Sequence, residues 1–319
     1  MTLSKSVSKR LKAQSSAPAF RDVYAAWFKD GCERNLNPFR PATAKSYKSQ
    51  IETNVLPVIG DLPVDTVGNI VLKDLASKMK ANGLAPATIH RNLNNIKDIR
   101  KFPNDGEKSL YPYDWNSRII DAPAIDKKAQ KRPIASAQAV QAALSCLCGT
   151  QGTKLLLAVL AGSGMRIQEA LAIVKVDPAI GDGVVGNVWL PEKSKILVNA
   201  QRDGAAFGPT KTPAGMREVD LHPRLNALML SEFDGTGYIF NRPESTYRDD
   251  LIRCGITGGF HSLRRFRVTH LRMQGIPDSL IHFWVGHEDA SVTGRYTEVG
   301  IEIEKRKKLA EQAGLGFEL

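Results

Sequence analysis

The sequence predicts two domains: a mainly α-helical domain, followed by an α+β domain in which a small antiparallel β-sheet is inserted among helices. Three observations lead to this prediction. At 319 residues the chain is too long for one ordinary hydrophobic core. Hydrophobic residues make up 42% of it, enough to fold both domains. Apolar residues recur at helical spacing over residues 17–102, whereas short β-rich stretches enter only after Pro133.

The helical domain is expected to contain four helices. The first carries an apolar stripe that includes Trp27, Pro41 opens the second, the third ends at Gly83, and Pro86 starts the fourth. Proline suits these starts because a first-turn N–H has no partner inside its helix. After Pro133, helices are predicted at 137–146 and 154–160, strands near 184–190, 207–212 and 217–221, and helices again to the end.

The charge is distributed unevenly along the chain. The net charge is +11, with 23 Lys and Arg against 13 Asp and Glu in residues 1–132, and 21 against 20 in residues 133–319. A polyanion is therefore the expected partner, with nucleic acid ahead of an anionic membrane surface. We predict a basic flexible tail at 1–16, a helical domain at 17–105, a basic linker at 106–132 and the α+β domain with a C-terminal tail at 133–319.

Two groups of basic residues are candidate contacts to phosphate. They lie off the apolar stripe of the fourth helix and in the linker. The residues are Arg91, Lys97, Arg100 and Lys101 on the helix, and Lys127, Lys128, Lys131 and Arg132 in the linker.

Several classes of protein are disfavoured. The longest apolar run, residues 155–162, is too short to span a bilayer, and the basic N-terminus is not followed by the apolar run of a secretory signal. The four cysteines lack Cys-x-x-Cys metal spacing, and we find no ATP-binding motif. We therefore expect a cytoplasmic protein that uses no cofactor and has no membrane partner.

A basic segment near the C-terminus predicts an anion site. His261 and Arg264 are three residues apart and would share one face of a helix. Arg264, Arg265, Arg267 and Arg272 have no acidic residue near them between positions 261 and 277, whereas a solvated helix would interleave opposite charges. The alternative is an amphipathic helix with a basic face and an ordinary apolar core side.

Arg166 is a second candidate for anion binding. It follows a Gly-Ser-Gly turn at a predicted helix start, where backbone amides also favour an anion. The alternative is a surface arginine at an ordinary helix N-terminus.

These motifs together resemble the tyrosine recombinase, or phage integrase, family. The pattern His261-x-x-Arg264, then Gly286-His287, then Tyr296 nine residues later is similar to the C-terminal signature of that family. Residues 164–171 resemble its first arginine motif, Gly-hydrophobic-Arg-x-x-Glu, and residues 43–64 look like part of its core-binding domain. The likeness covers residues 17–296 and implies a helical core-binding domain and an α+β catalytic domain that form a C-shaped clamp around double-stranded DNA.

The resemblance also implies a role for each candidate site residue. Arg166 and Arg264 would hold the scissile phosphate, Glu169 would support them, and His261 and His287 would assist at the phosphate. Tyr296 would be the nucleophile. Lys211 resembles the β-hairpin lysine that protonates the leaving 5′-oxygen, although Lys193 and Lys195 lie in the same predicted sheet region.

The implied activity is site-specific recombination of DNA through a 3′-phosphotyrosyl intermediate and a Holliday junction. The protein would be a monomer or weak dimer by itself and a tetramer in the synapse. The alternatives are a type IB topoisomerase-like enzyme and a catalytically silent DNA-binding accessory protein. The segment before residue 17 is shorter than the arm-binding domain of some phage integrases, which puts arm-type recognition of accessory DNA sites in doubt. Residues 301–314 predict an amphipathic helix with little to bury at home, which would dock on a neighbouring protomer.

Overall fold

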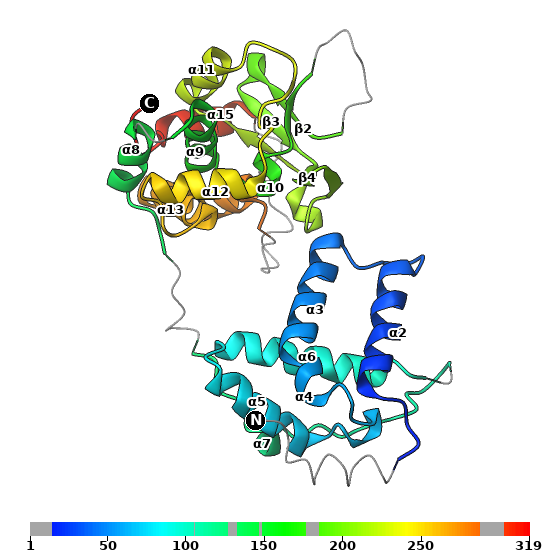
Figure 1. Cartoon of the computed structure of the whole chain (residues 1–319). Helices are drawn as coiled ribbons and strands as arrows, with labels where there is room; N and C mark the ends of the chain where they lie inside the picture. Colours follow the sequence, from blue (N-terminus) through cyan, green and yellow to red (C-terminus); the bar gives the residue numbers. More distant parts are fainter. Residues whose placement is uncertain (1–14, 105, 127–132, 147–148, 177–184, 288–302) are drawn as a thin grey trace. The chain divides into compact units, whose positions relative to one another are not determined.

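The computed structural model describes residues 15–104, 106–126, 133–146, 149–176, 185–287 and 303–319 (Figure 1). The chain divides into two compact units, residues 1–130 and 131–319, and separate hydrophobic clusters form the cores of the two. We call them the first and the second unit. Within the described residues, no helix is both long enough and apolar enough to cross a membrane.

The first unit is helical, as predicted. Pro41 and Pro86 lie in the first turns of α3 and α6, which confirms the expected helix starts. Its core contains Phe20, Leu72 and Ile96, all fully buried. The elements are α2 (Phe20–Glu33), α3 (Pro41–Asn54), α4 (Leu56–Ile59), η1 (Val64–Thr66), α5 (Asn69–Ala81), α6 (Pro86–Lys101) and α7 (Ser117–Ile120).

The second unit combines helices with two small sheets (Figure 1). Its helices are α8 (Ala137–Ser145), α9 (Gln151–Ser163), α10 (Ile167–Ala170), α11 (Pro223–Glu232), α12 (Glu244–Arg253), α13 (Phe260–Met273), α14 (Asp278–Val285) and α15 (Ile303–Gln312), with the short 3-10 helices η2 (Pro191–Lys193) and η3 (Pro213–Gly215). Its strands are β1 (Ile173–Lys175), β2 (Asn187–Leu190), β3 (Lys195–Val198), β4 (Ala200–Asp203), β5 (Ala206–Pro209), β6 (Arg217–Asp220) and β7 (Gly237–Tyr238).

The main sheet is mixed, which corrects the prediction of a purely antiparallel one. Its strand order is β6-β3-β2-β1-β7, and β1 pairs with β2 in parallel while the other neighbours are antiparallel. The strands β4 and β5 form a separate antiparallel pair. Three-residue β1 and lysine-led β3 carry too weak an alternation of apolar and polar residues to be predicted as strands.

Helix α9 lies at the centre of the second unit. Its residues 155–163 are all buried, and α8, α10, α11, α12 and α13 pack around it. A helix that is apolar on every side has to be enclosed in this way. Its C-terminus at Ser163 leads directly into Arg166, and α13, which carries His261 and Arg264, packs against it. The core therefore positions two of the predicted arginines.

The C-terminal segment packs on its own unit, so the premise that it has little to bury there is wrong. Arg306 of α15 is buried and forms ion pairs with Glu218 and Asp220 of β6, the latter at 3.0 Å. Leu315 and Phe317, beyond α15, join the main core of the unit. Docking of this segment on a neighbouring protomer is consequently not required to cover its apolar residues.

Candidate active site

Arg166 and Glu169 are locked together at the start of α10. The Glu169 carboxylate accepts hydrogen bonds from the Arg166 backbone N–H at 2.9 Å and from its guanidinium at 2.7 Å. Because α10 spans only Ile167–Ala170 and Glu169 occupies that first N–H, the expected contribution of helix amides to anion binding is not supported. The guanidinium of Arg166 remains partly exposed, whereas the Glu169 side chain is only 1% exposed.

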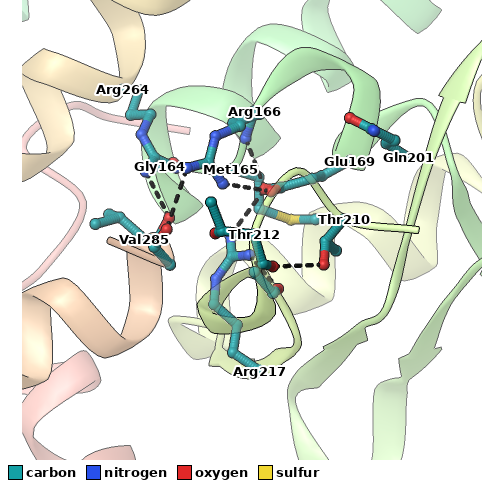
Figure 2. Close-up of polar contacts among 12 residues, drawn as sticks. Gly164, Met165, Arg166, Glu169, Gln201, Thr210, Thr212, Arg217, Arg264 and Val285 are labelled. Atoms are coloured by element: carbon teal, nitrogen blue, oxygen red, sulfur yellow. Dashed lines mark hydrogen bonds and ion pairs between the residues drawn. The ribbon is translucent and has the colours of Figure 1, made fainter. Parts of the chain in front are cut away.

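The C-terminus of α14 is where the arginines of the site meet. Three successive backbone carbonyls there each accept a hydrogen bond from a different arginine: Trp284 from Arg217, Val285 from Arg264, and Gly286 from Arg166. The last carbonyls of a helix have no partner inside the helix and carry partial negative charge, so guanidinium groups are suitable partners. Figure 2 shows Arg264 at the Val285 carbonyl, with Arg166 beside it.

Arg264 is the most deeply buried of the predicted site arginines and histidines. It is 3% exposed, and its second guanidinium nitrogen donates to the Gly164 carbonyl at 2.8 Å. Burial, followed by the positive charge of Arg166, lowers the pKa of Arg264 to about 9. The group is still charged at neutral pH. Because burial and Arg166 disfavour this charge, a bound anion would stabilise it.

Arg217, at the start of β6, belongs to the same cluster although the sequence analysis gave it no role. Its side chain is 1% exposed and donates to Glu169 at 2.8 Å (Figure 2). One signal could have revealed it. Arg217 and Val219 point to the same side of β6, and Val219 is buried, so an arginine at this position faces the core and needs a carboxylate.

The two predicted histidines lie close to the arginine pair. His261 is the second residue of α13, and burial followed by the charges of Arg264, Arg265, Arg166 and Lys211 lowers its pKa. His287 directly follows Gly286 and is exposed, but partial desolvation of its ring, followed by the charges of Arg264 and Arg166, lowers its pKa to about 4. Both imidazoles are therefore neutral at pH 7, which lets them accept a proton as well as donate one.

Lys211 lies on the exposed loop between β5 and β6. Thr210 beside it is buried and donates to the Thr212 carbonyl at 2.9 Å, so the loop makes a tight turn at Lys211. Of the alternative lysines, Lys195 is buried in an ion pair with Glu218 at 3.0 Å, and Lys193 is exposed in η2. Of the three lysines, Lys211 is the one whose charge contributes to lowering the pKa of His261, and its role stays a prediction.

Comparison with known proteins places the fold. No protein-family profile and no curated protein sequence matches the chain. Among solved structures it is similar to the Tn1549 transposon integrase in complex with transposon right-end DNA, with a TM-score of 0.59, 17% identity, and 92% of this chain and 94% of that chain covered. The chain has the integrase fold.

The chain is also similar in structure to a second integrase, that of lambda. A lambda integrase dimer bound to a COC′ core site has a TM-score of 0.61 and 12% identity, covering 88% of this chain and 95% of that chain. A lambda integrase tetramer bound to a Holliday junction has a TM-score of 0.57 and 13% identity, covering 89% and 79%. The predicted fold class, a helical domain with an α+β catalytic-type domain, is confirmed by these similarities.

Some predicted residues of the integrase fold lie outside the described residues. These are Tyr296, the proposed nucleophile, and the linker residues Lys127, Lys128, Lys131 and Arg132. The described neighbours of Tyr296 in the sequence are His287 before it and α15 after it. In the described part of the chain, no group of three or more His, Cys, Asp or Glu residues is arranged to hold a metal ion.

The basic residues on α6 of the first unit differ from one another. Arg91 and Lys101 are exposed, and Lys97 is half-buried with its ammonium 5.6 Å from the centre of the Trp115 ring. Arg100 is 4% exposed, bonds to the Val67 and Tyr111 carbonyls, and lies over the Tyr113 ring. We correct the prediction for Arg100, because its guanidinium is committed inside the first unit and is not presented to DNA.

Proposed function

We propose that this protein is a site-specific DNA recombinase of the tyrosine recombinase family. The observation that carries the proposal is the cluster at the C-terminus of α14, where Arg166 meets His261, Arg264 and His287, which follow it in the chain by 95, 98 and 121 residues. These residues match the family pattern one by one. The integrase fold, and the DNA and the Holliday junction bound by the solved integrases, support the same proposal.

In the proposed reaction Arg166 and Arg264 hold the non-bridging oxygens of one phosphodiester. Planar guanidinium groups suit this role because they carry several N–H donors and stay charged at neutral pH. Each terminal nitrogen of Arg264 has a second N–H besides the one that it donates to the Gly164 or the Val285 carbonyl. The Tyr296 phenol attacks phosphorus and passes its proton to a neutral imidazole, for which His261 and His287 are the candidates. A new phosphorus–oxygen bond forms to the tyrosine as the bond to the 5′-oxygen breaks, and Lys211 gives a proton to that oxygen.

The reverse reaction completes strand exchange. A 5′-hydroxyl from a second duplex attacks the 3′-phosphotyrosyl link, so the energy of the broken bond is kept and no nucleotide is consumed. We propose that four protomers act on two duplexes and pass through a Holliday junction. The exposed residues Arg91 and Lys101 and the linker lysines would contact phosphates away from the cleavage point.

The test is a covalent DNA–protein adduct. Duplexes would be selected from a random pool by repeated binding to the full chain, nicked at successive positions, labelled, and analysed on a denaturing gel after incubation with protein. The wild type should form an adduct in the presence of EDTA. Tyr296→Phe removes one oxygen and little volume, so it should bind the same duplexes and form no adduct.

The outcomes separate the alternatives. An adduct with Tyr296→Phe would mean that another residue is the nucleophile. An adduct together with relaxation of supercoiled DNA, and without exchange between paired sites, would indicate a type IB topoisomerase-like enzyme. Binding without any adduct from the wild type would indicate a catalytically silent DNA-binding protein.

A further inference from the structure

Arg217 connects three parts of the second unit through three hydrogen bonds. Its Nε donates to the Trp284 carbonyl at 2.6 Å, one terminal nitrogen donates to the Gly215 carbonyl at 2.8 Å, and the other donates to the Glu169 carboxylate at 2.8 Å. These partners belong to α14, to the loop before β6 and to α10. Arginine is the side chain that can do this, because its planar guanidinium directs donors from three nitrogens in fixed directions.

Each partner of Arg217 leads to a different residue of the proposed site. Glu169 holds Arg166 through its backbone and its guanidinium. Trp284 lies at the end of α14, three residues before His287. Gly215 closes the loop that begins after β5 and presents Lys211, and it packs against Thr210 so closely that a Cβ would lie 2.5 Å from that side chain.

Gly286 makes room for this arrangement. It has φ +65°, and a Cβ at this position would lie 2.9 Å from a terminal nitrogen of Arg217 and 3.0 Å from the Ala214 carbonyl oxygen. The chain between α14 and His287 therefore lies directly against Arg217. The glycine in the Gly-His pair of the signature has a physical reason here, in addition to ending the helix.

We propose that Arg217 is a positioning residue that sets the mutual placement of Arg166, Lys211 and His287 for cleavage. It does not itself contact the phosphate, because its side chain is 1% exposed and its three donating nitrogens are all in use within the protein. This inference rests on the proposed function. The inference adds to the site a residue whose hydrogen bonds hold α10, the end of α14 and the loop before β6 at fixed distances from one another.

A purely structural role is the alternative, in which Arg217 only balances the buried charge of Glu169. The two roles predict different effects of replacing Arg217. For a positioning residue, the slowing of cleavage should depend on the charge of the phosphate, whereas for a purely structural residue it should not. Misplaced arginines should matter most when the phosphate carries its full charge in the transition state. A methylphosphonate at the cleavage position removes one negative charge, so the contribution of the arginines to the rate should be smaller.

The experiment measures single-turnover strand cleavage by the full chain at saturating protein. The substrates are the selected nicked duplex with a phosphodiester or a methylphosphonate at the cleavage position. The variants are Arg217→Met, which keeps the volume, and Arg217→Lys, which keeps the charge but cannot direct three bonds. Arg242→Met is the matched control, because Arg242 pairs at 2.8 Å with the buried Asp250 of the same unit and contacts no residue of the proposed site.

We expect Arg217→Met to slow cleavage of the phosphodiester about 100-fold and that of the methylphosphonate less than about tenfold. Arg217→Lys should not restore the phosphodiester rate, and the control should slow both substrates equally. The ratio of the two rates is taken within one variant, so partial unfolding cancels. Equal losses on both substrates, full recovery with lysine, or no loss would overturn the inference. A wild type that cleaves neither substrate would instead contradict the proposed function.

Discussion

Replacing Glu169 with glutamine should destabilise the second unit by about 3 kcal/mol at pH 7. Glutamine keeps the volume of the side chain but removes the charge that Arg217 and Arg166 share. Glu169 and Arg217 are each 1% exposed and lie 2.8 Å apart, so the guanidinium would remain buried without its carboxylate. Breaking a buried ion pair from one side costs about 3–5 kcal/mol. We take the lower end because the Trp284 and Gly215 carbonyls still bond to Arg217.

The effect should depend on pH with a definite sign. Burial by itself would raise the pKa of Glu169, but the charge and hydrogen bond of Arg217, together with Arg166, outweigh it and hold the pKa below its usual value. A carboxylate with a depressed pKa stabilises the folded state above its unfolded pKa of about 4.3, and this stabilisation is lost as pH falls through the folded pKa. The difference between wild type and Glu169→Gln should thus be constant from pH 7 to about 5 and shrink in stronger acid.

Urea unfolding followed by tryptophan fluorescence would measure this difference. Trp27→Phe and Trp115→Phe in the background leave Trp189 and Trp284 as reporters of the second unit. Glu304→Gln is the matched control, because Glu304 is exposed and its surface pair with Lys307 should contribute less than about 1 kcal/mol. A loss below about 1 kcal/mol for Glu169→Gln at pH 7, or a difference that persists unchanged in acid, would refute the reasoning.

Three further predictions follow from charge. Neutralising the four linker residues Lys127, Lys128, Lys131 and Arg132 with glutamine should reduce the slope of log affinity against log salt by up to about 3.6, and an unchanged slope in a binding titration would exclude these contacts. Phosphate should raise the pKa of His287 from about 4, so DNA binding near pH 5–6 should be accompanied by uptake of a proton and should strengthen as pH falls. Calorimetry would measure this pH dependence, which His287→Gln should weaken. Arg306→Met removes the ion-pair partner of the buried Asp220 and should cost about 3 kcal/mol in urea unfolding; a loss near zero would mean that this pair is unimportant.

Local rules account for the parts of the structure that the sequence predicted. Prolines mark the starts of α3 and α6, and His261 and Arg264, three residues apart, both lie on α13 as their spacing predicts. The link between Arg166 and Glu169 is also local, since Glu169 accepts from the backbone N–H and the guanidinium of Arg166 within one turn. Each of these features depends on residues less than five positions apart.

Features that depend on distant partners could not be predicted in the same way. Arg217 and Glu169 are far apart in the chain and meet only because β6 lies beside α14 and near α10. Arg100 lies off the apolar stripe of α6 like the exposed Arg91 and Lys101, but Tyr113 and Trp115 from a later loop cover it. The parallel pairing of β1 with β2 is likewise a property of the assembled sheet, because neither strand encodes the direction of its neighbour.

The charge balance at the C-terminus of α14 supports the phosphate position that we propose. Among the described residues of the cluster, Arg166, Arg217 and Arg264 bring three positive charges, and Glu169 is the carboxylate that faces them. The helix-end carbonyls offset part of the excess, since the C-terminus of a helix is equivalent to roughly half a negative charge. The remaining excess lies on Arg166 and Arg264. Three arginines, one carboxylate and about half a negative charge from the helix end leave an excess of about 1.5 positive charges. In the proposed reaction, a phosphodiester under attack gains a second negative charge, and this excess would attract both the bound phosphate and the charge added in the transition state.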